Sequence, residues 1–223
     1  MITREFLKEH YNNIFIKNKE AIIKGGEKDT FLEDAENDNR MSLCVLIRIS
    51  PDISNNIEKC INKIKEIESN NLYYYPISDF HITVIDILKG EIGRNIPQNI
   101  NDYINCINEV VKQIKPFNIE FDGITASNNA ILVKGFYDNE LQKFRENLRE
   151  NLKKKNLKLE ERFKTISSHI TIARVKNEFK YPDKLISFIN EQNYFGKMEI
   201  KSMELTFHNW YDTKKQIITK FNL

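Results

Sequence analysis

The sequence predicts an α+β protein with two lobes that each carry a β-sheet. Segments with apolar residues at helical spacing alternate with segments in which every second residue is apolar, the patterns of amphipathic helices and half-buried strands. Two of these strands share a short motif, "HITV" at 81–84 and "HITI" at 169–172, one in each half of the chain. Strand, helix and motif strand follow one another in both halves, which indicates a coarse internal duplication.

Composition indicates a soluble globular protein without an extended nucleic-acid-binding surface. The chain has 223 residues, of which 40% are hydrophobic and 30% charged, and 34 basic residues nearly balance 32 acidic ones to give a net charge of +2. A protein that binds long nucleic acids usually shows a strongly basic face or domain. Any contact with nucleic acid is therefore expected to be local, such as a pocket for one or two nucleotides.

Cysteines and apolar segments predict a cytoplasmic location. Cys44, Cys60 and Cys106 are widely spaced, with no CxxC pair and no histidine at zinc spacing, which favours reduced thiols over disulfides or a structural metal. The N-terminal segment "MITREFLKEHYNN" has charges throughout and lacks the apolar core of a signal peptide. No apolar stretch approaches the ~18 residues needed to span a bilayer. We therefore expect no membrane contact.

The elements follow from periodicity and from turn residues. Residues 1–40 are expected to form an N-terminal helical extension and a charged, Gly-containing loop, and 41–223 the main bilobal domain. Expected strands lie at 41–50, around 81–87, at 117–125 and 130–136 as an antiparallel pair, around 169–175, and at 197–210 and 214–223. Expected helices lie at 3–24, 51–70, 98–115, 139–155 and 181–192. The basic stretch 145–158 is predicted to be a solvated helix face.

The repeated motif places a histidine and a threonine on one face of each strand. Because side chains alternate along a strand, His81 and Thr83 point to one side, and His169 and Thr171 do the same in the second half. The pKa of histidine is near ~6.5, so one imidazole can act as a base while the other acts as an acid. Threonine hydroxyls can donate to phosphate oxygens. This set is sufficient for phosphoester chemistry without a metal.

The histidines have two alternative interpretations. A single His-x-Thr on a strand is most often structural, but two copies with the same central isoleucine are hard to explain by composition. In a metal site, His81, His169 and His208 would converge with Asp86. Because no carboxylate or thiol lies at a recognisable ligand spacing, we expect neither a metal nor another cofactor.

Three further residues are candidates for substrate binding. In "MELTFHNWYD", His208 and Trp210 share the face opposite the apolar residues, so His208 could contact phosphate and Trp210 could stack on a base. An exposed strand end is the plainer interpretation of this segment. In "LYYYP", Tyr75 could stack on a base, or the aromatic residues could belong to the core. Strand alternation places Arg174 on the face opposite His169, where it would support the fold or the rim.

The segments "FHITVIDI" and "SHITIARV" resemble the paired motifs of the two-histidine phosphoesterase superfamily, which includes bacterial 2'-5' RNA ligase-like proteins and cyclic nucleotide phosphodiesterases. The resemblance covers roughly 41–223. It implies two pseudo-symmetric α+β lobes, each an antiparallel sheet with helices packed outside, around a central groove. It also implies that His81 and His169 are the catalytic acid–base pair and that Thr83 and Thr171 bind phosphate. Residues 1–40 have no counterpart in the smallest members and could cap one end of the groove.

These observations together predict a metal-independent phosphodiesterase. It would hydrolyse a 2',3'-cyclic phosphate or a 2'-5' phosphodiester in a small nucleotide or at an RNA end, and the protein is expected to be a monomer. The alternatives are a nucleotide- or RNA-binding module with little or no turnover, and a metal-dependent hydrolase.

Overall fold

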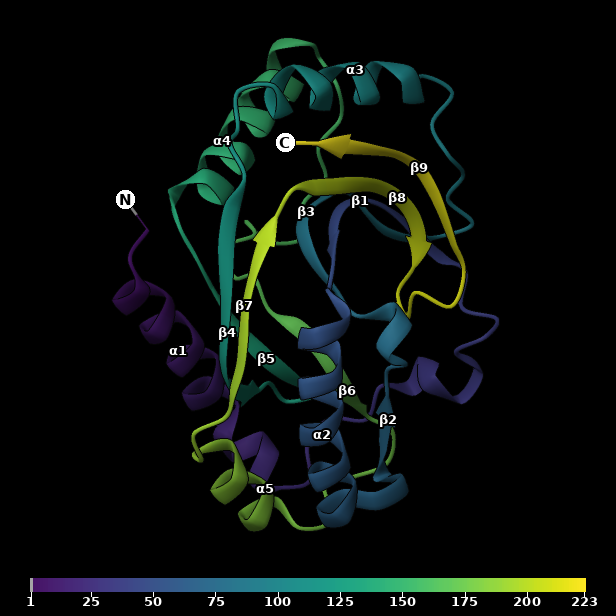
Figure 1. The fold of residues 1–223 in the computed structure, drawn as a ribbon. Coiled ribbons are helices and arrows are strands. Elements are labelled where there is room, and N and C mark those ends of the chain that lie inside the picture. Colours follow the sequence, from purple (N-terminus) through teal and green to yellow (C-terminus); the bar gives the residue numbers. More distant parts are fainter. Residues whose placement is uncertain (1) are drawn as a thin grey trace.

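A computed structural model describes residues 2–223 and contains two antiparallel β-sheets, which confirms the predicted α+β class and its two lobes (Figure 1). The first, sheet A, has the strand order β3-β1-β8-β9. Its strands are β1 (Arg40–Arg48), β3 (His81–Ile92), β8 (Ser202–Asn209) and β9 (Lys215–Asn222). The second, sheet B, has the strand order β2-β6-β5-β4-β7. Its strands are β2 (Leu72–Tyr74), β4 (Phe117–Ala126), β5 (Ala130–Tyr137), β6 (Ile170–Val175) and β7 (Tyr194–Ile200).

The described part of the chain, residues 2–223, also contains five α-helices and three short 3-10 helices. The α-helices are α1 (Arg4–Ile23), α2 (Pro51–Glu68), α3 (Ile100–Val111), α4 (Asn139–Lys154) and α5 (Pro182–Ile189), and the 3-10 helices are η1 (Thr30–Asp34), η2 (Ser69–Asn71) and η3 (Ile77–Asp79). The predicted helices at 51–70, 98–115 and 139–155 are thus confirmed to within a few residues. No helix among residues 2–223 combines the length and the apolarity needed to cross a membrane.

Two of the helices pack on the lobe opposite to the one that contains the preceding strand. Helix α2 follows β1 of sheet A but packs on sheet B, where Asn56 Nδ2 donates to the Phe195 carbonyl in β7 at 2.9 Å. Helix α4 follows β5 of sheet B but packs beside α3 and against β3 of sheet A. Each histidine strand is therefore antiparallel to the strand that precedes one of these helices, β1 for β3 and β5 for β6. This arrangement repeats one unit in both halves and ties the lobes together.

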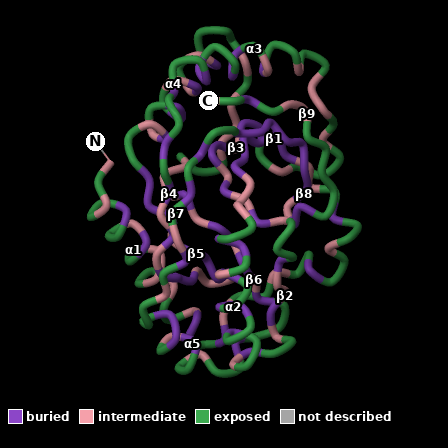
Figure 2. Tube along the Cα trace, viewed as in Figure 1, coloured by how far each residue is buried: buried purple, intermediate pink, exposed green. Residues whose placement is uncertain are grey.

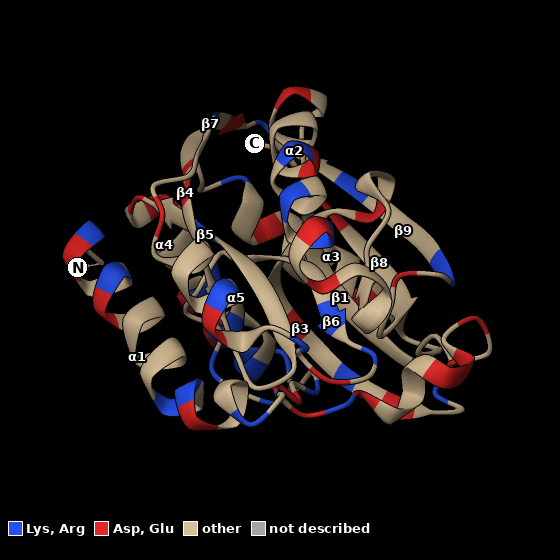
Figure 3. Cartoon of the chain, turned by 90° about the horizontal axis from the view of Figure 1, so that it is seen from below, with Lys and Arg blue, Asp and Glu red and all other residues tan. Residues whose placement is uncertain are grey.

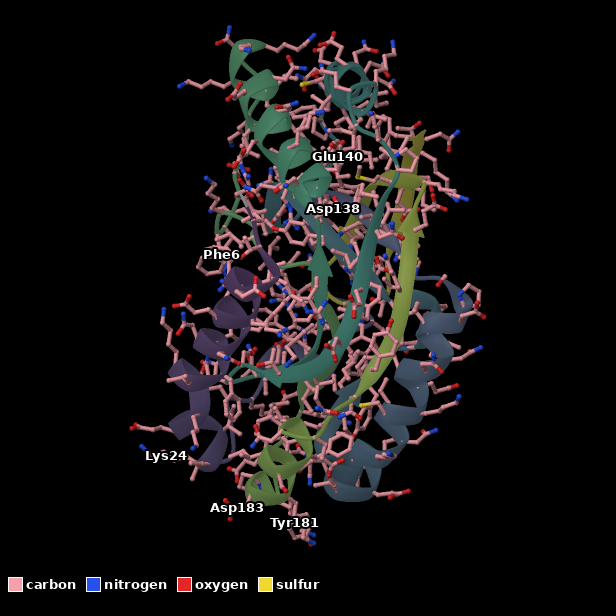
Figure 4. All side chains as sticks on the ribbon, turned by 60° about the vertical axis from the view of Figure 1, so that its left-hand side comes forward. Phe6, Lys24, Asp138, Glu140, Tyr181 and Asp183 are labelled. Atoms are coloured by element: carbon pink, nitrogen blue, oxygen red, sulfur yellow. The ribbon has the colours of Figure 1, made fainter. Side chains whose placement is uncertain are left out.

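Helix α1 packs on the face of sheet B opposite to α2 (Figure 4). The Tyr11 ring meets the Phe136 ring edge-on at 5.7 Å, and Thr125 Oγ1 donates to the Tyr11 carbonyl. Thr125 pairs with Leu132, and Leu132 pairs with Thr171, so these three side chains share one face. Helix α1 therefore covers the β4–β5 part of the face that carries the second motif. The division of the chain at residue 40 stays a prediction.

The predicted single strand at 197–210 is wrong. It forms two strands, β7 in sheet B and β8 in sheet A, separated at Lys201. Met198 and Ile200 are buried before the break and Met203 after it, so the alternation shifts by one residue at the exposed pair Lys201–Ser202. The chain uses this shift to pass from one lobe to the other.

Buried residues form one core that runs through both lobes between the sheets and the helices (Figure 2). Acidic and basic residues are interspersed over the visible helices (Figure 3), in keeping with the nearly neutral net charge. A few polar and charged side chains are nevertheless buried, and many of them lie near the two histidine motifs.

Candidate active site

The first motif begins β3. Ile82 and Val84 are fully buried, whereas His81 and Thr83 on the other face are only partly buried. His81 Nδ1 lies 2.7 Å from the Asp79 carbonyl oxygen. Because a carbonyl can only accept, Nδ1 carries the hydrogen and donates it. In the neutral imidazole, Nε2 then presents a lone pair to a reactant.

A β-bulge brings Asp86 to the same face as the first motif. Along β1, Leu46 pairs with Thr83 and the next residue, Val45, pairs with Ile85, so Val84 is the extra residue. Beyond the bulge Asp86 pairs with Cys44, which has the same parity on β1 as Leu46. Burial raises the pKa of Asp86 to about 6, and Cys44 Sγ lies 3.4 Å from its Oδ1. Asp86, a carboxyl group with a near-neutral pKa, is thus the next side chain after Thr83 on this face.

The second motif lies at the start of β6. His169 immediately precedes the strand and its Nδ1 lies 2.8 Å from Ser167 Oγ, while Thr171 is in the strand. Both motif rings are thus held through Nδ1, and no hydrogen bond from residues 2–223 reaches Nε2 of either ring.

The predicted face of Arg174 is wrong, because β6 also contains a bulge. Thr171 pairs with Leu132 and Arg174 pairs with Ala130, two β5 residues of the same parity. Arg174 therefore lies on the motif-bearing face, and its Nε donates to the Tyr75 hydroxyl at 2.9 Å. Strand alternation alone could not reveal the extra residue.

The environment of the two motif histidines favours their neutral forms. For His81, burial and the nearby His208 lower the pKa to about 4. For His169, burial, Arg174 and His81 lower the pKa to about 4. Strands β3 and β6, which carry the two motifs, contact each other.

A third histidine adjoins the first motif. His208 in β8 pairs with Ser42, which has the same parity on β1 as Arg48, the partner of His81. The two imidazole rings are perpendicular, with centroids 5.5 Å apart. His208 is only 5% exposed, so the interpretation of this segment as an exposed strand end does not hold. Its Nδ1 lies 3.0 Å from Asp212 Oδ1.

Charged residues hold the loop that carries the Asp79 carbonyl. Lys215 Nζ bonds to Asp79 at 2.7 Å and to Asp212 at 2.9 Å, and Arg48 bonds to Asp212 at 2.6 Å and to Glu204 at 2.6 Å. Burial alone would raise the pKa of Asp212, but its contacts with His208 and Arg48 and the nearby charge of His81 hold it well below the usual value. The network thus supports His81 indirectly through Asp79.

Tyr75 and Trp210, the other two candidates, lie beside Arg174. Tyr75 is buried, with its ring 5.2 Å from that of Tyr73 and its hydroxyl bound to Arg174. Trp210 is partly exposed, and the Arg174 guanidinium lies 5.2 Å from its ring centroid. The ring of Tyr75 is thus a core aromatic, while Trp210 keeps an accessible surface. Roles for both in substrate binding stay predictions.

Two buried residues that the sequence did not single out support the second motif. The Tyr11 hydroxyl in α1 accepts from the Ser168 backbone N–H at 3.1 Å. Arg145 in α4 is fully buried and donates to the carbonyls of Ile166 and Ser167, so it does not belong to a solvated helix face. Its position in the sequence could have indicated that it is buried, because Arg145 lies on the apolar stripe of α4 next to Phe144.

Among residues 2–223, no group of three or more His, Cys, Asp or Glu side chains is arranged to hold a metal ion.

Comparisons with known proteins identify the family. A model of the 2'-5' RNA ligase superfamily matches residues 52–210. The structure resembles that of TT0787 from Thermus thermophilus, with a TM-score of 0.62, 15% identity, and coverage of 82% of this chain and 97% of the other. It also resembles E. coli LigT in apo form, with a TM-score of 0.59, 12% identity, and coverage of 82% and 97%. LigT has also been crystallised with 3'-AMP, a structure matched with a TM-score of 0.55, 11% identity, and coverage of 82% and 97%.

No curated protein sequence matches the chain. The family model nevertheless spans both histidine motifs, and the structural neighbours share the two-lobe fold. The chain therefore belongs to the 2'-5' RNA ligase superfamily, a group of two-histidine phosphoesterases.

Proposed function

We propose that the protein is a metal-independent phosphodiesterase that hydrolyses a 2',3'-cyclic phosphate or a 2'-5' phosphodiester in a small nucleotide or at an RNA end. One observation carries this proposal. His81 and His169 are both bound through Nδ1, and their Nε2 atoms have no protein partner among residues 2–223. An acid–base pair needs this arrangement, because each ring must exchange a proton with the substrate while keeping its orientation.

For a cyclic phosphate, the reaction needs one neutral and one protonated imidazole. The neutral ring takes a proton from water as the water oxygen attacks phosphorus. The bond from phosphorus to one ribose oxygen breaks, and the protonated ring gives its proton to that oxygen. The product is a phosphomonoester, and the two rings have exchanged protonation states. Which histidine is the acid depends on the orientation of the substrate.

The low pKa values of His81 and His169 mean that the general acid must gain a proton before it can act. With both values near 4, both motif rings are neutral in the free protein at neutral pH. An anionic phosphodiester bound between the rings favours a nearby imidazolium and raises its pKa. The acid is therefore expected to gain its proton together with the substrate.

Neighbouring side chains can bind the phosphate and the nucleoside. Thr83 and Thr171 lie on the motif-bearing faces, where their hydroxyls can donate to non-bridging oxygens. Arg174 adds positive charge on the face that carries Thr171. His208 is a candidate for a further phosphate contact and Trp210 for base stacking.

Nucleotide complexes of a protein with the same fold support a small nucleotide as substrate. LigT has been crystallised with 3'-AMP, with ATP and with NADP+. A chain with the same fold and a nearly neutral net charge fits a ligand of this size better than a long nucleic acid.

The test is hydrolysis of a 2',3'-cyclic mononucleotide and of a 2'-5' oligoadenylate in excess chelator. We expect turnover that survives the chelator and falls by ~10²–10⁴-fold in both His81→Ala and His169→Ala. Lys89→Ala, which changes an exposed residue of β3, is the matched control and should keep wild-type activity.

Other results would favour the alternatives. Binding of both substrates without turnover favours a nucleotide- or RNA-binding module. Activity lost on chelation and restored by a divalent cation favours a metal-dependent hydrolase.

A further inference from the structure

Arg145 is a buried cation on the apolar stripe of α4. It lies between Leu141 and Leu148, one turn from each, and all three side chains are fully buried. Burial lowers its pKa to about 10, so it remains charged at neutral pH. No ion pair among residues 2–223 includes it, as its polar contacts are with three carbonyls and one hydroxyl.

The guanidinium binds the backbone of the first histidine motif and of the segment that leads into the second. Its Nε donates to the Val84 carbonyl in the first motif at 2.7 Å. Its Nη1 and Nη2 donate to the carbonyls of Ile166 and Ser167, each at 2.7 Å, in the segment that leads into His169. One rigid planar group thus sets the distance between β3 and the start of the second motif.

Both contacts occur where the sheets provide little support. Val84 is the extra residue of the β3 bulge and has no partner residue in β1. Residues 166–169 precede β6 and belong to no strand. Without Arg145, the Val84, Ile166 and Ser167 carbonyls would lose a charged donor at positions that no ladder fixes. Ser167 matters most, because its hydroxyl holds Nδ1 of His169.

The energetics of the site argue that Arg145 is not simply a core residue. Moving an unpaired cation out of water is costly, and an apolar side chain of similar volume is often at least as stabilising. Arg145 also acts on the second motif through its charge, which contributes to the low pKa of His169. A residue that is costly to bury and that binds both the first motif and the segment leading into the second is expected to serve the site.

We propose that Arg145 is a positioning residue that holds the two histidine motifs at the separation needed for catalysis. This inference rests on the proposed function for its kinetic consequence. Its structural content, the coupling of the two motifs through one side chain, can be measured without turnover.

The experiment compares Arg145→Met, Arg145→Lys and a control, Leu148→Ala, in the full-length protein. Methionine removes the charge and the donors, whereas lysine keeps the charge but cannot span three carbonyls from one nitrogen. Leu148 is fully buried one turn away and its side chain has no polar group, so Leu148→Ala removes apolar volume without removing a hydrogen bond. Melting temperature, kcat, KM and the imidazole NMR titrations of His81 and His169 are measured for each.

We expect both Arg145 variants to lower kcat by roughly 10–100-fold with a smaller change in KM, because the reacting groups are misplaced while the binding groups remain. The pKa of His169 should rise in Arg145→Met, which loses the nearby cation, but not in Arg145→Lys. The imidazole signals of both motifs should shift in both Arg145 variants. Leu148→Ala should lower the melting temperature without changing kcat or these signals.

Folded Arg145 variants with wild-type kcat and unchanged imidazole signals would overturn the inference, as would a loss of kcat in Leu148→Ala as large as theirs. If the wild type hydrolyses neither substrate, the proposed function fails instead. The imidazole signals then decide the role of Arg145 alone: shifts at both motifs support it, and unchanged signals refute it.

Discussion

The Tyr11 hydroxyl connects the N-terminal helix to the second histidine motif. Tyr11 is fully buried, and its hydroxyl donates to the Gly135 carbonyl at 3.0 Å. The same oxygen accepts the backbone N–H groups of Gly135 at 3.2 Å and Ser168 at 3.1 Å. Burial raises its pKa to about 12, so the hydroxyl keeps its proton at neutral pH. The substitution Tyr11→Phe removes this oxygen and leaves the ring in place.

The expected destabilisation follows from the groups left unpaired. The Gly135 and Ser168 N–H groups both lose their acceptor, and an unsatisfied buried donor costs about 1–3 kcal/mol. The Gly135 carbonyl loses less, because it keeps the Ser168 hydroxyl as a donor at 2.9 Å. We therefore expect the free energy of unfolding to fall by about 2–6 kcal/mol. Catalysis should fall less than in the Arg145 variants, because Arg145 still binds the carbonyls just before Ser168.

Urea unfolding followed by far-UV circular dichroism measures this change. The matched control is Tyr194→Phe, which removes a hydroxyl from a residue that is 64% exposed. This substitution should change the free energy of unfolding by less than about 0.5 kcal/mol. If Tyr11→Phe changed the free energy of unfolding as little as the control does, the three hydrogen bonds would contribute nothing net. The view that α1 supports the second motif would then be wrong.

Three further predictions concern the site itself. Thr171→Val should lower kcat by about 10²-fold in the hydrolysis assay with little change in melting temperature, because it removes a phosphate donor and keeps the shape. His208→Gln should raise KM by about 10-fold and lower kcat less if His208 contacts phosphate; an unchanged KM would exclude that contact. Stability should fall from pH 6.5 to 4, because unfolded His81 and His169 bind protons in this window while the folded rings, with pKa values of about 4, do not. Asp86, with its pKa raised to about 6, acts in the opposite direction. The net loss of stability is therefore about 1–3 kcal/mol after allowance for partial exposure. Urea unfolding of the double variant His81→Gln/His169→Gln should show no such loss of stability between these pH values.

Periodicity predicted the elements that are amphipathic and regular. The α4 stripe of Leu141, Phe144, Leu148 and Leu152 is buried as expected, and the two histidine strands present their motifs on the face opposite to buried isoleucines. These predictions depend only on local spacing, because the apolar face of a helix or strand is buried by packing against the core. The break at Lys201–Ser202 was also visible, as two polar residues that interrupt the alternation, but it is easily mistaken for a variation within one strand.

Bulges limited the prediction of the site. One extra residue in β3 turns Asp86 toward the first motif, and one extra residue in β6 turns Arg174 toward the second. Beyond a bulge every side chain changes face, so strict alternation gives the wrong answer from that point onward. Neither bulge contains glycine, so composition offered no signal.

The second motif shows why a catalytic pair is easier to recognise than its support. His169 and Thr171 are identified by their own side chains, but the segment before them is fixed through backbone groups, the Ile166 and Ser167 carbonyls and the Ser168 N–H. Every residue type offers the same carbonyl, so no pattern at these positions can indicate which distant side chain will bind them. The partners, Tyr11 and Arg145, come from two helices far apart in sequence, α1 and α4. Their only local sign is a polar atom on an apolar stripe, and a charged residue at such a position is therefore the feature to examine first in a chain of this kind.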